Sequence, residues 1–309
     1  RSMGEKVRVA STILVLCRQK SPTVCQFDYS ILFVKRSAKT RFMPSAHVFP
    51  GGVIEECDGT FQSNVAVRSD EEEKMAFRVG AVRELFEETG LLLAHEQTKS
   101  SSSLPSPAAS TYELGTNHNH YRQAVHTDAN QFYSLLADKL LEPCSEALIP
   151  WSRWITPVVE KRRYDTWFYL TVLHDTPDSD ASPDTSGEVT SSVWYTPDEA
   201  LSAARNGQIW LAPPTTYLLT ELSQRGRTIA DVMEMGKHRK ICAWLPTISL
   251  QQKRLTVALP GDPLHKQSKE SGSVTGLHRC VSGKEGAKLG EGFFEVIFSQ
   301  DSTAKGSKL

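Results

Sequence analysis

Three glutamates lie close together in the stretch RELFEETGLLL, which covers residues 83–93. Glu84, Glu87 and Glu88 are spaced i, i+3 and i+4, so on a helix their side chains share one face. Like charges at this spacing repel, at a cost of roughly 0.2–0.5 kcal/mol per pair. A hard divalent cation prefers oxygen ligands and would offset that repulsion. The spacing therefore predicts either a solvated helix face or a metal site, and the surrounding sequence has to decide between them.

The composition excludes several classes of protein. The 309 residues carry 35 Lys and Arg against 36 Asp and Glu, so no global charge attracts the chain to nucleic acid or to a membrane surface. We expect no nucleic-acid partner and no membrane insertion, because the apolar run at 13–17 is far too short to span a bilayer. The six cysteines form no CxxC pair, which argues against a zinc ribbon and a disulfide framework and fits a reducing compartment.

The glutamates need a helix to hold them, and the pattern predicts one from about Lys74 to Thr89. Its apolar residues cluster on about half of the helical circumference and the glutamates fall on the other half. Gly90 follows directly, as is typical of a helix C-terminus. The apolar residues of this predicted helix are Val79, Ala81, Val82, Leu85 and Phe86.

Strands and helices are expected on both sides of this helix. The expected strands cover 7–17, 29–36, a short segment from 53, then 153–159, 165–173, 189–197 and several runs within 253–299. Further helices are expected at 128–141, from 197 and at 216–224. The Ser- and Pro-rich segment 95–118 is expected to be a loop, and its His118 and His120 a loop pair with no metal. This mixture predicts one elaborated α+β sandwich.

The glutamate segment resembles the Nudix box, a Gly-Gly turn and an acidic residue followed by R-E-U-x-E-E-x-G-U, where U is aliphatic. Gly51 and Gly52 supply the turn, and residues 83–91 match every fixed position of the second half. The first half departs from the pattern, because Asp58 stands where Glu is usual and residues 59–82 form a longer spacer than the box has. Closure entropy grows only logarithmically with loop length, so we expect the activity to be retained.

The resemblance implies a Nudix-type α/β/α sandwich with a mixed sheet, inserted helices and a C-terminal β extension. We expect the Nudix domain at 7–245, with insertions at about 58–74 and 95–145. The β extension is expected at 246–306.

The resemblance also assigns roles to individual residues. Glu84, Glu87 and Glu88 are expected to be catalytic and to hold Mg²⁺ or Mn²⁺, with Glu84 as the candidate general base. Arg83 is expected to hold the helix in place. Glu188 matches a late metal-binding or base glutamate of some members, although it could equally be a surface glutamate.

The segment before the box resembles the coenzyme A signature of coenzyme A diphosphatases. It pairs Arg36-Ser37-Ala38 with Arg41 and ends in Phe-Pro-Gly-Gly. It differs from the signature in two ways: one residue fewer lies between Ala38 and Arg41, and Ser45 replaces a glycine. The resemblance makes Arg36, Arg41, Gly51 and Gly52 candidate substrate-binding residues. Both arginines are suitable partners for phosphates, including the 3′-phosphate of coenzyme A. The alternative for Arg36 is a strand end in solvent.

Over most of its length the chain resembles peroxisomal Nudix coenzyme A diphosphatases with a long insertion inside the box. That resemblance implies hydrolysis of coenzyme A and acyl-coenzyme A to 3′,5′-ADP and 4′-phosphopantetheine or its acyl form. Arg163, with Arg162 and Tyr164, either lines the substrate channel or forms a basic strand end in solvent.

Three other functions compete with this one. A Nudix diphosphatase for NADH or ADP-ribose would share the box, but the four-cysteine zinc module common in peroxisomal NADH enzymes is missing from the sequence. An RNA-cap hydrolase lacks support because no basic stripe with interleaved aromatic residues is present. A non-catalytic nucleotide-binding Nudix module would be favoured by loss of a box glutamate, and none is lost.

The last three residues, Ser307-Lys308-Leu309, match a peroxisomal targeting tripeptide read by an import receptor. Deleting them should move a fluorescently tagged protein from peroxisomes to the cytosol without altering its turnover, because the tripeptide is an address outside the core. Microscopy of cells that carry a peroxisomal marker checks this prediction. Unchanged punctate fluorescence after the deletion would mean that another signal directs the protein.

Overall fold

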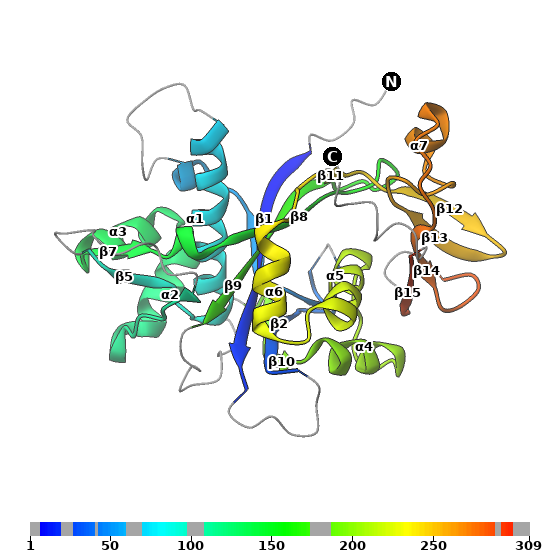
Figure 1. The fold of residues 1–309 in the computed structure, drawn as a ribbon. Helices are drawn as coiled ribbons and strands as arrows, with labels where there is room; N and C mark the ends of the chain where they lie inside the picture. Colours follow the sequence, from blue (N-terminus) through cyan, green and yellow to red (C-terminus); the bar gives the residue numbers. More distant parts are fainter. Residues whose placement is uncertain are drawn as a thin grey trace.

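A mixed sheet of nine strands runs through the middle of the molecule (Figure 1). The computed structural model describes residues 7–19, 27–40, 43–59, 70–97, 108–173, 187–287 and 292–298. The strands of this sheet are β1 Arg8–Arg18, β2 Tyr29–Arg36, β3 His47–Val48, β4 Gly51–Val53, β6 Ala108–Ala109, β8 Ile149–Ile155, β9 Tyr164–Leu173, β10 Val189–Tyr195 and β11 Ala243–Trp244.

The strand order of the main path is β10-β2-β1-β9-β8-β11. β1 pairs in parallel with β9 and antiparallel with β2, so the sheet is mixed, as predicted. The short strand β4 adds to the same β1, with Ser11 opposite Gly52 and Thr12 opposite Gly51. This pairing fixes the Gly-Gly turn against the central strand of the sheet.

Both faces of the central strands are buried, which explains why their sequences are continuous apolar runs. Side chains alternate across a strand, so Ile13 and Val15 of β1 join one core cluster and Leu14 and Leu16 join the other. Strand β9 divides its side chains between the two clusters in the same way.

Helices cover each face of the sheet, which gives the predicted α/β/α sandwich. Figure 1 shows α1, α2 and α3 on one side and α4, α5 and α6 on the other. The helices of the first layer are α1 Asp70–Thr89, α2 His118–Thr127 and α3 Asn130–Asp138. The second layer consists of α4 Pro197–Arg205, α5 Pro213–Arg225 and α6 Ile229–Lys237. Short 3₁₀ turns are η1 Glu56–Gly59, η2 Gly115–Asn117 and η3 Ser145–Ala147.

The C-terminal part forms a separate antiparallel sheet in the order β12-β13-β14-β15. Its inner residues Cys280 and Phe294 belong to the same core cluster as Leu218 of α5, so the sheet packs on the second helix layer. The elements of this part are β12 Thr247–Gln251, β13 Arg254–Ala258, α7 Lys266–Ser271, β14 His278–Ser282 and β15 Phe294–Phe298. A further two-stranded sheet pairs β5 Ala94–Glu96 with β7 Leu141–Pro143.

The structure corrects several predicted boundaries. Helix α1 begins at Asp70, earlier than 74, and the predicted helix 128–141 is the shorter α3, because Asp128 is extended and Leu140 has a φ of 53°. The predicted helix 216–224 extends over Pro213–Arg225. Helices α2, α6 and α7 were not predicted, although the Thr228–Asp231 capping box before α6 is visible in the sequence. The loop expected at 95–118 contains β5, β6 and η2, and residues 98–107 lie outside the described part.

No helix within the described residues combines the length and hydropathy that crossing a bilayer requires. The five cysteines in this part of the chain, Cys17, Cys57, Cys144, Cys242 and Cys280, are free thiols.

Candidate active site

The C-terminal end of α1 borders a cavity of about 1290 Å³. The glutamates therefore do not face open solvent, and Glu87 and Glu88 are buried while Glu84 is partly exposed. The cavity is lined by seven of the predicted site residues, which are Arg36, Gly51, Gly52, Glu84, Glu87, Glu88 and Glu188.

The two glycines allow the glutamate helix and the sheet to approach each other closely. Gly51 donates its backbone N–H to Glu88 Oε2 at 2.9 Å. Its φ is +153°, and a Cβ there would lie 2.3 Å from the carbonyl oxygen of Ser11. A Cβ on Gly52 would lie 2.5 Å from the carboxylate of Glu84. Any side chain at either position would collide with the backbone of β1 or with the carboxylate of Glu84.

Arg83 is buried at the centre of a group of carboxylates, with only 2% of its side chain exposed. Its Nε and Nη2 donate to both oxygens of Asp58 at 2.8 and 3.0 Å. Its Nη1 donates to Glu87 at 2.5 Å and to Glu84 at 3.0 Å. Tyr133 of α3 donates its hydroxyl to the same Asp58. Arg83 thus holds two of the glutamates and the η1 turn in one arrangement.

Two inserted helices, α2 and α3, support the end of the glutamate helix. Arg122 of α2 is buried and donates to the carbonyl oxygens of Glu87 at 2.7 Å and Glu88 at 2.5 Å. These carbonyls lie in the last turn of α1, where the helix itself provides no partner. The His118 ring lies 2.7 Å from the carbonyl oxygen of Gly90, so this histidine has a structural partner. The sequence analysis missed Arg122 and Tyr133, because neither belongs to a motif.

Burial raises the pKa of all three glutamates. The pKa of Glu88 rises to about 8, chiefly because burial penalises its charged form, although the Gly51 N–H and the charge of Arg36 act in the opposite direction. Burial also raises the pKa of Glu84 well above its ordinary value, and the charges of Glu87 and Glu88 add to the rise. The pKa of Glu87 is raised for the same main reason, against the charge of Arg83.

The donor set fits a hard divalent cation. Within the described ranges, no three His, Cys, Asp or Glu side chains form a group ready to hold a metal ion. Glu84 and Glu87 are instead bonded to Arg83. The glutamates nevertheless place several carboxylate oxygens on one cavity wall, where burial disfavours their negative charge. A cation bound there would offset both the desolvation and the mutual repulsion.

The predicted phosphate-binding residues have different outcomes. Arg36 lines the cavity on the glutamate side, and its charge opposes the larger effect of burial that raises the pKa of Glu88. Arg41 lies outside the described residues. Arg163 is not part of the cavity wall. Its Nε donates to the carbonyl oxygen of Thr156 at 3.0 Å.

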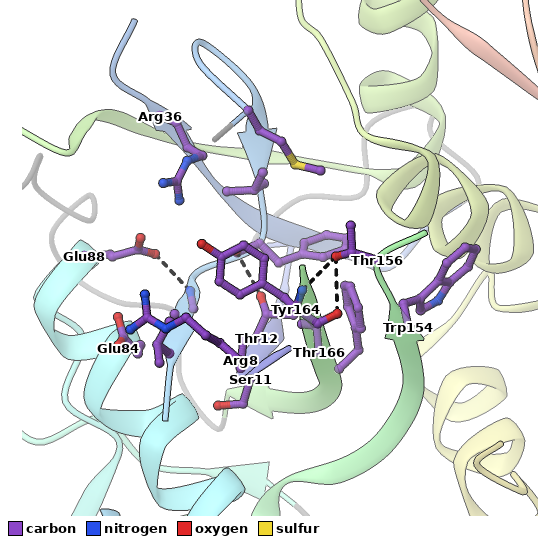
Figure 2. A pocket seen from close by; sticks show the side chains of 18 of the residues that line it. Arg8, Ser11, Thr12, Arg36, Glu84, Glu88, Trp154, Thr156, Tyr164 and Thr166 are labelled. Atoms are coloured by element: carbon purple, nitrogen blue, oxygen red, sulfur yellow. Dashed lines mark hydrogen bonds between the residues drawn. The ribbon is translucent and has the colours of Figure 1, made fainter. Parts of the chain in front are cut away.

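Sequence analysis missed Arg8, a cation of the cavity wall. Arg8 lies on β1 and lines the same cavity as Glu84, and Figure 2 shows both side chains at the site. Tyr164, for which one of the two alternatives was a place in the substrate channel, also lines the cavity. A lone arginine at the start of a strand gives no sequence pattern that would have identified it.

A family model and several curated relatives match most of this chain. The family model described as the NUDT19 Nudix domain matches residues 7–71 and 59–222. Acyl-coenzyme A diphosphatase NUDT19 of Xenopus laevis is 32% identical over 297 residues, with 82% of this chain and 75% of the relative covered. The protein of the same name from Homo sapiens is 31% identical over 287 residues, with 78% and 74% covered.

Two other matches extend the comparison. Putative nudix hydrolase 7 of Caenorhabditis elegans is 31% identical over 242 residues, with 78% of this chain and 71% of the relative covered. Among solved structures, a NUDIX hydrolase from Alicyclobacillus acidocaldarius superposes with a TM-score of 0.58 at 20% identity, with 76% of this chain and 97% of that chain covered. The structural likeness supports the fold assignment.

The raised pKa of Glu88 predicts how the stability of the metal-free protein depends on pH. The native state keeps the Glu88 proton up to about pH 8, whereas the unfolded chain releases it near 4.5. The free energy of unfolding should therefore fall as pH rises through this window, by up to about 1.4 kcal/mol per pH unit for one proton. Glu88→Gln should flatten the slope, as measured by urea denaturation in EDTA between pH 5 and 8.

Glu142→Gln is the matched control, because Glu142 is an exposed glutamate of β7 away from the cavity. It should keep the slope of the unchanged protein. Equal slopes for Glu88→Gln and Glu142→Gln would contradict the raised pKa of Glu88.

Proposed function

Because the chain belongs to the NUDT19 Nudix family, we propose that it hydrolyses the diphosphate of coenzyme A and acyl-coenzyme A. The products would be 3′,5′-ADP and 4′-phosphopantetheine or its acyl form. The observation that carries the proposal is the complete set of box glutamates on the wall of a large cavity. The names of the Xenopus laevis and Homo sapiens relatives supply the substrate class.

Glu84, Glu87 and Glu88 are the residues that would hold a divalent cation, which we propose to be Mg²⁺ or Mn²⁺. Such an ion, when bound, polarises a diphosphate and lowers the pKa of a water molecule. Glu84 is the proposed general base, since it is the most exposed of the three carboxylates and lies beside Arg83. Exposed Glu188, which also lines the cavity, is a further candidate for metal or proton contact.

The arginines of the cavity wall are suited to bind the substrate phosphates. Arg8 and Arg36 are carried by neighbouring strands of the sheet and both line the cavity. One guanidinium group can donate two parallel hydrogen bonds to two oxygens of the same phosphate, which orients the anion as well as attracting it. Because the charge of Arg36 acts on Glu88, we propose that Arg36 binds the diphosphate that lies between the glutamates and the arginines. This position makes a 3′-phosphate contact of Arg36 less favoured than the sequence suggested.

The decisive experiment is a substrate panel with the purified protein and added Mg²⁺ or Mn²⁺. Free coenzyme A, acyl-coenzyme A, NADH and ADP-ribose should be compared by separating the products on a column. Preferential release of 3′,5′-ADP from coenzyme A substrates supports the proposal. Preferential cleavage of NADH or ADP-ribose contradicts the proposed substrate class, and absence of turnover with every substrate points to a non-catalytic module.

We also propose a peroxisomal location and recognition by the peroxisomal import receptor. The proposal rests on Ser307-Lys308-Leu309 alone, which lie outside the described residues. The deletion experiment given with the sequence tests it.

Glu88→Gln should leave a folded protein whose kcat for coenzyme A falls by at least about 100-fold, because the variant loses a carboxylate that would hold the divalent cation, and with it the charge stabilisation that this ion supplies. Steady-state kinetics at saturating metal, with circular dichroism as a check of folding, gives the measurement. Glu142→Gln, which removes the charge of an exposed glutamate, should keep normal turnover. A Glu88→Gln enzyme with near-normal kcat would refute the proposed site.

Arg36→Ala should lower kcat/KM for coenzyme A by about 10- to 150-fold, because a hydrogen bond to a charged group contributes about 1.5–3 kcal/mol. Contact with the diphosphate predicts a similar loss with 3′-dephospho-coenzyme A. Both substrates are assayed on one preparation, so misfolding cancels from the comparison. A loss confined to coenzyme A would instead assign Arg36 to the 3′-phosphate, as the sequence signature alone suggests.

A further inference from the structure

Besides the glutamates and arginines, the cavity wall carries a group of apolar residues. Figure 2 shows Glu84, Glu88 and Arg36 towards one side of the cavity and Trp154 on the opposite side. The apolar half, as the term is used below, is lined by Trp154, Phe168, Pro213, Pro246, Ile248 and Val257.

This apolar half is built where the central sheet meets the C-terminal sheet. Trp154 belongs to β8 and Phe168 to β9, whereas Ile248 and Val257 belong to β12 and β13. The C-terminal strands lie beyond residue 222, where the match to the family model ends. The C-terminal sheet therefore adds part of a wall to a cavity whose charged half belongs to the Nudix domain.

Trp154 presents an apolar surface whose polar atom is already bonded. Its indole Nε1 donates to Ser152 Oγ at 3.0 Å. Its ring is fixed by edge-to-face contacts with Tyr217 and Trp244, whose centroids lie 5.6 and 5.1 Å away. Thr156, which also lines the cavity, has its hydroxyl bonded to the backbone of Tyr164 at 3.0 and 3.2 Å.

The chemistry of this lining favours an alkyl chain over a nucleobase. A base buried in a pocket needs hydrogen-bond partners for its ring nitrogens and amino group, because unpaired buried polar groups are costly. Proline has no backbone N–H, and Pro213 and Pro246 both lie in this wall. An alkyl chain needs no such partners and gains free energy with each methylene removed from water.

We propose that the apolar half binds the acyl chain of acyl-coenzyme A, with the diphosphate held at the glutamates. This assignment rests on the proposed function. It makes the C-terminal sheet, through Ile248 and Val257, a determinant of acyl-chain preference. The adenosine 3′-phosphate of the bound substrate then lies beyond the glutamates, on the side away from Trp154.

The experiment compares acetyl-coenzyme A with decanoyl-coenzyme A in the complete enzyme. In the unchanged protein, kcat/KM should be higher for the decanoyl ester. Ile248→Gln keeps the side-chain size but puts an amide in the apolar half, and Ile248 is half-buried, so the strand should tolerate it. The ratio of kcat/KM for decanoyl over acetyl should fall about tenfold, equivalent to about 1.4 kcal/mol, and kcat/KM for acetyl should stay nearly constant.

Leu250→Gln is the matched control, because Leu250 lies on the same strand β12 with 64% of its surface exposed and is not part of the cavity wall. It should leave the ratio unchanged. Val257→Thr, a change of similar shape on β13 in the same half of the cavity, is a second test should Ile248→Gln melt at a lower temperature than the unchanged protein. A lowered ratio with either cavity variant supports the proposal.

Three results would overturn the acyl assignment. An equal loss with both esters would mean that this half holds a part common to them, such as the adenosine. The apolar half would not bind the acyl chain if both cavity variants kept the ratio of kcat/KM for decanoyl over acetyl. The same conclusion would follow if the unchanged protein showed no preference for the decanoyl ester.

Failure of the proposed function is distinguished by a binding measurement. If the unchanged protein cleaves neither ester, titration calorimetry in EDTA still compares their affinities. Decanoyl-coenzyme A should bind more tightly than acetyl-coenzyme A, and Ile248→Gln should reduce the difference about tenfold. Equal affinities would overturn the acyl assignment independently of turnover.

Discussion

The arrangement of this site depends on one buried cation, the guanidinium of Arg83. It bonds Asp58 through two nitrogens and reaches Glu84 and Glu87 with a third. Removing one partner of a buried ion pair costs about 3–5 kcal/mol, because the other charge is left without compensation. The η1 turn, the glutamate helix and α3, through Tyr133, are all tied to this group. The relative position of these three elements is therefore set by a charge balance as well as by packing.

Arg83 does not balance the whole site, and the imbalance is what makes the site suitable for a metal. Three carboxylates, those of Asp58, Glu84 and Glu87, share the Arg83 guanidinium, while Glu88 accepts a hydrogen bond from the Gly51 N–H. Burial raises the pKa of all three glutamates, because it removes water that would otherwise stabilise their charged forms, and repulsion between neighbouring carboxylates adds to the rise. The fold thus holds carboxylates close together at a cost in stability that a divalent cation would reverse.

The sequence predicted the parts of this site that follow from local patterns. The period of the apolar residues located α1, and the Gly-Gly pair located the turn that approaches Glu84 and Glu88. It could not predict the support from Arg122, because that contact joins the inserted helix α2 to carbonyl oxygens that every residue possesses. Arg8 was missed for a similar reason, since only the pairing of β1 with its neighbours brings it to the cavity. Periodicity alone left a solvated helix face and a metal site open, because it separates two helix faces without showing what the polar one meets; in the structure the glutamates line a cavity.

The long spacer inside the box leaves the Asp58–Arg83 pair intact, and the reason is energetic. Closing a longer loop adds entropy cost only logarithmically, so a few charge-assisted hydrogen bonds outweigh the added length. The second insertion contributes directly, since its helices supply Arg122 and Tyr133 to the glutamate end. The C-terminal sheet supplies Ile248 and Val257 to the opposite end of the same cavity. The segments around the sandwich therefore act at both ends of one site: α2 and α3 support the helix that carries the glutamates, and the C-terminal sheet shapes the opposite end of the cavity.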